Sequence, residues 1–111
     1  FIAARYAMDE FVEKGNLFLL YSGLLKENQK KVYAYHIMED MSFSEIGIEM
    51  NITRQAAQYL YSKADEQLRF MEENLQLGKK WLRIRALAEK IAEQSGDEEI
   101  RKLAGEIMHG I

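Results

Sequence analysis

Hydrogen-bonding side chains alternate with apolar ones between residues 53 and 63, in the segment TRQAAQYLYSK. At helical spacing Arg54, Gln55, Gln58 and Tyr59 fall on the side away from the apolar residues. A guanidinium such as that of Arg54 can donate two hydrogen bonds to guanine, and the carboxamides of Gln55 and Gln58 can pair with adenine. Each such contact discriminates against the wrong base by about 1–3 kcal/mol. The segment therefore carries the residue types that read base edges in a nucleic-acid groove.

The same segment offers groups that bind phosphate. Hydroxyl and ammonium groups contact the nucleic-acid backbone and orient a protein on it without reading sequence. No acidic residue lies between positions 53 and 64, so this stretch is basic within a chain of net charge −3. The overall charge counts against strong binding to a polyanion, and Arg54 and Lys63 can equally be solvated surface cations. The candidates for phosphate contacts are Thr53, Tyr61, Ser62 and Lys63.

Presenting these residues requires a short preceding helix and a tight turn. Ser42 and Glu45 have the S-x-x-E spacing of a capping box, which starts a helix. Asn51 falls in the turn, where a positive φ is expected and asparagine is tolerated. Thr53 can then cap the second helix. Residues 42–68 are therefore predicted to form a helix-turn-helix, whose recognition helix spans Thr53 to Lys63.

Packing between the two helices is predicted from small and apolar side chains at matching positions. Gly47 has no side chain, which allows the second helix to approach the first. A plain helical hairpin with no nucleic-acid role would satisfy the same steric pattern, because a fold does not fix a function. The apolar residues expected where the helices meet are Ile46, Met50, Ile52, Ala57 and Leu60.

Helical spacing continues through the rest of the chain, which contains no proline. We expect an all-α protein: one helical domain over 8–111, with C-terminal helices over 71–109. Met8 is expected as the native start, with 1–7 as upstream or added residues. The expected helices of the first part cover 9–25, 26–38, 43–50 and 54–75, and the first of them is expected to break at Gly15-Asn16. After an interruption at Gly78, two further helices are expected around Trp81–Ile91 and Ile100–Met108.

Catalytic and metal sites are not indicated. The chain has no cysteine, and His36 and His109 are too few and too distant in sequence for a metal site. There is no glycine-rich phosphate loop and no nucleophile motif, and Glu39-Asp40 is more typical of a solvated helix break than of a carboxylate pair. No stretch reaches the roughly 20 apolar residues of a membrane span. We expect a non-enzyme without cofactors, located in the cytoplasm and away from membranes.

The C-terminal helices carry two further features. Trp81 and Leu82, with Phe70 and Met71, are predicted to be core residues, or alternatively the interface of a homodimer. The second feature is a basic cluster around Trp81, interpreted as a solvated helix face or, less favourably, as a nucleic-acid surface that combines charge with stacking. Its members are Lys79, Lys80, Arg83 and Arg85.

The run from Asn16 to Leu68, about half of the chain, resembles the YlxM family of bacterial helix-turn-helix proteins, also called p13-like. The same run is similar to region 4 of sigma-70-type factors, whose helix-turn-helix binds promoter DNA. It departs from the usual family pattern at Leu20, at Gly47 and over 57–62. The residues that carry the resemblance are Tyr21, Leu24-Leu25, Gln29, Tyr33, Glu39-Asp40, Ser42, Glu45-Ile46 and, most specifically, Thr53-Arg54-Gln55-Ala56.

This resemblance implies a sigma-70 region 4-like helix-turn-helix bundle with additional C-terminal helices. YlxM-like proteins are encoded beside the GTPases of the signal recognition particle, which implies a regulatory role in that protein-targeting pathway. The leading hypothesis is a nucleic-acid-binding regulator with DNA, or the signal recognition RNA, as its partner. The alternative is a protein-interaction module that contacts the signal recognition particle GTPases without sequence-specific DNA binding, and a purely structural helical adaptor is a third.

Overall fold

The computed structural model describes residues 10–109, which contain α-helices, one 3-10 turn and no strand. The expected all-α class is therefore confirmed. The described residues pack as two compact units, one ending at Leu75 and the other starting at Gln76. Whether these units act as the single domain predicted over 8–111 stays a prediction, and the expectation for 1–7 concerns residues outside the described range.

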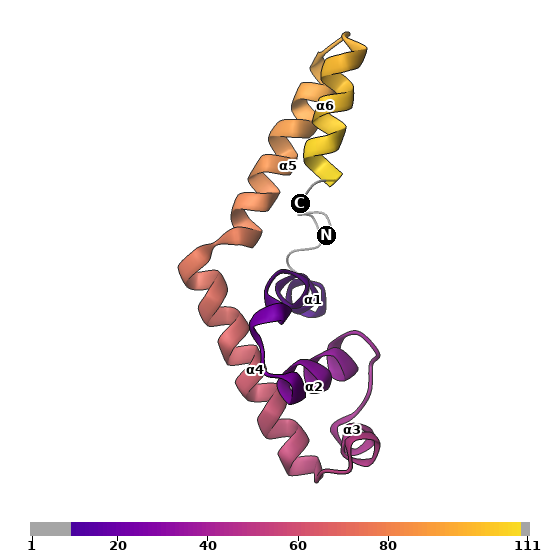
Figure 1. Ribbon diagram of the computed structural model, residues 1–111, viewed down its shortest axis with the longest axis vertical. Helices are drawn as coiled ribbons and strands as arrows, with labels where there is room; N and C mark the ends of the chain where they lie inside the picture. Colours follow the sequence, from indigo (N-terminus) through magenta and orange to yellow (C-terminus); the bar gives the residue numbers. More distant parts are fainter. Residues whose placement is uncertain (1–9, 110–111) are drawn as a thin grey trace. The chain divides into compact units, whose positions relative to one another are not determined.

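The first unit holds four helices (Figure 1): α1 (Glu10–Tyr21), α2 (Glu27–Ile37), α3 (Phe43–Met50) and α4 (Arg54–Leu75). A 3-10 turn over Ser22–Leu24 follows α1. The break expected at Gly15-Asn16 is wrong, because α1 continues through both residues and buries them. Packing of this helix face therefore outweighs the low helix propensity of glycine and asparagine.

Aromatic side chains form the centre of this unit. The rings of Phe18 and Tyr33 stack with centroids 5.6 Å apart, and those of Tyr33 and Tyr61 stack at 5.1 Å. The Tyr33 hydroxyl donates a hydrogen bond of 3.0 Å to Asp65. Burial, together with the Asp65 carboxylate, raises the pKa of the Tyr33 phenol, so it stays protonated as this bond requires. The stack fixes α2 against α4 at mid-helix.

A left-handed residue and a histidine contact set the path from α2 to α3. Asp40 has a φ of 55°. The Nδ1 atom of His36 lies 2.8 Å from the Met41 carbonyl oxygen. The His36 ring also stacks on Phe43 with centroids 4.4 Å apart. This histidine therefore helps to close the loop that leads into α3.

The second unit consists of α5 (Leu77–Gln94) and α6 (Glu98–His109), packed on each other as a hairpin. The interruption expected at Gly78 lies instead at Gln76, which adopts a φ of 55°, while Gly78 is buried inside α5. Residues 71–75, predicted to belong to the C-terminal helices, continue α4. At the hairpin turn the Asp97 carboxylate accepts a hydrogen bond of 2.8 Å from the Glu99 amide, so it caps α6.

Candidate nucleic-acid interface

The first helix of the motif begins with the predicted capping box. The Ser42 hydroxyl accepts a hydrogen bond of 3.1 Å from the Glu45 amide, and the Glu45 carboxylate accepts one of 3.0 Å from the Ser42 amide. The pKa of the Glu45 carboxyl is lowered mainly by its hydrogen bond with the Ser42 backbone and, to a smaller extent, by its interaction with the Ser42 side chain. The charged form of Glu45 is therefore the one that holds the start of α3 together.

Replacing Ser42 with alanine is expected to lower the free energy of unfolding by about 1 kcal/mol, because the Glu45 amide loses its only side-chain acceptor in the box. Chemical denaturation at neutral pH measures this difference. Ser44→Ala is the matched control, since Ser44 is exposed in the same helical turn and should leave stability within about 0.5 kcal/mol. Equal losses in the two variants would contradict a specific role of the cap.

The turn between α3 and α4 brings the backbones of the two helices close together. Asn51 adopts the left-handed conformation at φ 57° and ψ 46°, as its place in the turn predicts. The Ile52 amide donates a hydrogen bond of 2.9 Å to the Gly47 carbonyl. A Cβ atom at Gly47 would lie 2.8 Å from the Ile52 carbonyl oxygen, so only glycine fits without a shift of the backbone. The predicted need for a small residue here is confirmed.

The second helix is capped and anchored as expected. The Thr53 Oγ1 atom accepts a hydrogen bond of 3.0 Å from the Ala56 amide, which starts α4 at Arg54. Three residues from three helices are fully buried at the joint: Val32 of α2, Ile46 of α3 and Ala57 of α4. The other predicted contact residues pack against them, namely Met50, Ile52 and Leu60.

This anchoring leaves one side of the first half of α4 uncovered. Ala57, Ala64 and Leu68 are turned inward with no exposed surface, and the opposite side carries the polar groups. The seven residues predicted to contact nucleic acid are all exposed: Thr53, Arg54, Gln55, Gln58, Tyr59, Ser62 and Lys63. Their exposure makes contact with a ligand feasible, while their role stays a prediction.

Tyr61 does not belong to this surface, so its prediction as a phosphate contact is wrong. Its ring stacks on Tyr33 and meets the edge of His36, with centroids 4.7 Å apart. Its hydroxyl accepts a hydrogen bond of 3.0 Å from the Lys14 ammonium. Tyr61 lies four residues after the buried Ala57, and that spacing could have indicated its inward position.

Lys63 has neighbours that the segment alone does not reveal. Its ammonium lies 5.8 Å from the centroid of the Tyr59 ring and 3.6 Å from the Glu66 carboxylate, one turn further along α4. Both groups are exposed, so this ion pair contributes little stability and can exchange for another anion. Glu66 lies just beyond the stretch without acidic residues.

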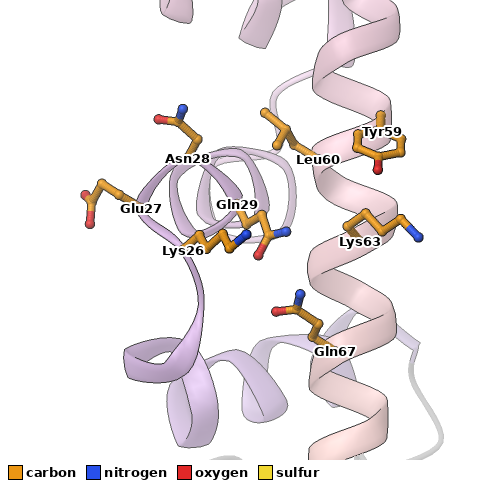
Figure 2. Close-up of a pocket in the computed structure, with 8 residues that line it drawn as sticks. All are labelled: Lys26, Glu27, Asn28, Gln29, Tyr59, Leu60, Lys63 and Gln67. Atoms are coloured by element: carbon orange, nitrogen blue, oxygen red, sulfur yellow. The ribbon is translucent and has the colours of Figure 1, made fainter.

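A hollow beside α4 adds residues that the sequence did not single out. The start of α2 lies next to the middle of α4 there, and Figure 2 shows the two sets of side chains around the gap. Lys26, at the N-cap position of α2, and Lys63 both line it, and so does the acidic Glu27. The Gln29 side chain, only 8% exposed, also lines the hollow, and its Oε1 atom has no hydrogen-bond partner within residues 10–109. No pattern near Lys26 predicts this proximity, because it arises from the packing of α2 on α4.

Metal-binding and membrane-spanning features are absent from the part of the chain that the structure describes. There, no three histidine or acidic side chains gather as metal ligands would. Among residues 10–109, no helix combines the length and the apolarity needed to cross a bilayer.

Comparison with known proteins shows which protein family the chain belongs to. Residues 8–107 match the profile of the UPF0122 family, described as "Putative helix-turn-helix protein, YlxM / p13 like". The chain belongs to this family. The resemblance seen in residues 16–68 therefore extends over nearly the whole UPF0122 chain, including α5 and most of α6.

Individual relatives share this family name. A UPF0122 protein of Fusobacterium nucleatum is 49% identical over 49 residues, which cover 44% of this chain and 48% of that relative. UPF0122 proteins of Mycoplasma capricolum and of a Thermoanaerobacter species are 34% and 30% identical, over 82% and 93% of this chain and 80% and 94% of those relatives. No solved structure gives a significant match.

Proposed function

We propose that this protein is a nucleic-acid-binding regulator that docks the first half of α4 in the major groove of DNA. The observation that carries the proposal is the division of α4 into two sides: its small and apolar residues are buried at the joint with α2 and α3, and its hydrogen-bonding residues are exposed together. A recognition helix needs this division, because one side must be fixed for the other to read bases. In this role the protein is not an enzyme.

Base reading is assigned to the start of the helix. Arg54 is at the first helical position, where recognition helices approach base edges, and it suits guanine O6 and N7. Gln55 and Gln58 suit adenine. Thr53 and Ser62 have hydroxyls at the edges of the surface, where the phosphates would run.

The hollow between α2 and α4 extends the surface for phosphate. Lys26 and Lys63 line it from opposite sides, and the uncapped amides at the start of α2 carry partial positive charge. A phosphate there would replace Glu66 as the partner of Lys63. Glu27 faces the same hollow and weakens its attraction for anions.

Fluorescence anisotropy of labelled random-sequence duplex DNA, titrated with the protein over a salt series, tests the proposal. We expect binding at low salt that weakens steeply as salt rises, because phosphate contacts release counterions. The Lys26→Ala and Lys63→Ala variants should each reduce the slope of log affinity against log salt by about 0.9. Absence of binding at low salt would refute the proposal, and unchanged slopes would remove the hollow from the contact surface.

The family resemblance also supports a proposal about where the protein acts. We propose that the protein works in the bacterial cytoplasm, in the signal recognition particle pathway, and that the signal recognition RNA is a second candidate ligand. We also propose that it acts as a homodimer, which would present two recognition helices to a symmetric site.

A second candidate function is a protein-interaction module that contacts the signal recognition particle GTPases. The observation that favours it is Ile48, an apolar residue of α3 that is 84% exposed beside the turn of the motif. Calorimetric titration with the GTPases, with and without their RNA, distinguishes the two functions. Association that Ile48→Glu abolishes and Arg54→Ala leaves intact would favour the protein partner.

A further inference from the structure

The α5–α6 hairpin has one apolar face that its own two helices leave half-exposed. The two helices pack on each other, and Ala88 of α5 and Ala104 of α6 are each about 1% exposed. Beside them stand six large aliphatic side chains, each between 41% and 51% exposed: Ile84, Leu87 and Ile91 on α5, and Ile100, Leu103 and Ile107 on α6.

Helical geometry places these six residues on the same side of the hairpin. In each helix they lie four residues before, one before and three after the buried alanine. These offsets span one flank of a helix at 100° per residue. Because the two helices run antiparallel with their alanines facing each other, equal offsets bring both flanks to one face. The result is a continuous apolar surface across two helices.

The hairpin is small, so exposing this apolar surface to water limits its stability. Chains of fewer than about 40 residues generally need cross-links, metals or association to fold stably. The second unit has 36 residues and the chain has no cysteine. The residues that α5 and α6 bury are Gly78, Trp81, Ala88 and Ala104, of which only the tryptophan is large. A further apolar surface packed on this face would therefore stabilise the hairpin.

Charge at the two ends of the hairpin indicates a second copy as that surface. Lys80 and Arg83 are exposed near the start of α5, at one end. Glu98 and Glu99 are exposed at the other end, where α6 begins. A copy turned end over end about a two-fold axis would bring the basic end of each hairpin to the acidic end of the other, where unlike charges attract.

We propose that two copies of this chain pair through this apolar face to form an antiparallel four-helix bundle. The inference rests on the homodimer proposed above and names its surface. Every side chain of the face meets the same face of the other copy, as a two-fold interface requires. The surface differs from the one expected from the sequence, because Trp81 is buried and Phe70 and Met71 belong to α4.

Sedimentation velocity of the full chain over a concentration series, without nucleic acid, tests the pairing. The protein is expected to sediment at twice its chain mass of 13.0 kDa. Leu87→Glu and Leu103→Glu place a charge on the face from either helix and should each halve the mass. Ile48→Glu is the control, since it changes an aliphatic residue of the first unit that is more exposed than Leu87 and Leu103, and it should leave the dimer intact.

A charge exchange tests the antiparallel arrangement in variants that leave the apolar residues untouched. Lys80→Glu should weaken the dimer, and adding Glu99→Lys to the same chain should restore it. A wild-type monomer would overturn both the homodimer and its surface. A dimer that persists in Leu87→Glu and Leu103→Glu would overturn this surface alone, and DNA binding by the wild-type chain is measured independently of either result.

Discussion

Replacing Gly47 with alanine is expected to lower the free energy of unfolding by about 1–3 kcal/mol. The added Cβ would lie 2.8 Å from the Ile52 carbonyl oxygen and 3.4 Å from the Arg54 amide nitrogen. Both neighbours are backbone atoms of the turn, so they can give way only if α4 moves away from α3. Thermal and chemical denaturation measure the loss. We also expect weaker DNA binding, because the displaced helix no longer holds its contact residues in place.

A loss of stability is the opposite of what replacing a helix glycine with alanine ordinarily causes. Glycine in the middle of a helix is ordinarily less favourable than alanine by about 0.5–1 kcal/mol, so a glycine without a steric role would gain stability on substitution. Gly15 is the matched control in α1, where the one described atom that a Cβ would meet is the Met38 sulfur, at 3.9 Å. Gly15→Ala should leave stability unchanged or raise it. A stabilised Gly47→Ala variant would contradict the close approach of the two helices.

Replacing Arg54 with alanine is expected to weaken binding to a preferred DNA sequence by about 5–150-fold, which corresponds to the 1–3 kcal/mol of a bidentate contact with guanine. The side chain is exposed at the first position of α4, and Arg54 is not one of the apolar residues that form the core of the joint. Stability should therefore stay within about 0.5 kcal/mol of the wild type. Anisotropy titrations on a sequence selected from a random library measure the change.

Arg69→Ala is the charge-matched control for this prediction. Arg69 lies further along the same helix, and its Nε atom is 3.1 Å from the Asp65 carboxylate. The substitution therefore removes one positive charge at a distance from the proposed base contacts. We expect it to leave the preferred sequence unchanged. If both variants weaken binding equally and for all sequences, the contribution of Arg54 is general charge rather than base reading.

The joint of the helix-turn-helix was predictable from the sequence because local sterics and hydrogen bonds determine it. Ser42 with Glu45, Gly47, Asn51 and Thr53 each satisfy a requirement set within a few residues along the chain. The structure shows all of them in the expected conformations. The similarity to region 4 of sigma factors stays a prediction, since it concerns the arrangement of whole helices.

Features that depend on packing between distant segments were missed. The start of α2 approaches Lys63 only because α2 crosses α4, and no spacing near Lys26 indicates this. The helix break at Gln76 could not be predicted from composition, because glutamine rarely adopts a positive φ while the nearby Gly78 is a common helix breaker. The inward position of Tyr61, by contrast, could have been predicted, because Tyr61 lies four residues after the buried Ala57.

Chemical-shift mapping of the labelled full chain, titrated with a short DNA duplex at low salt, shows whether the first half of α4 is the surface that binds DNA. We expect the amides of 53–63 and the start of α2 to shift together in proportion to bound DNA, while those of α5 and α6 change little. Shifts confined to the C-terminal hairpin, or no shifts in α4 when DNA is bound, would contradict it.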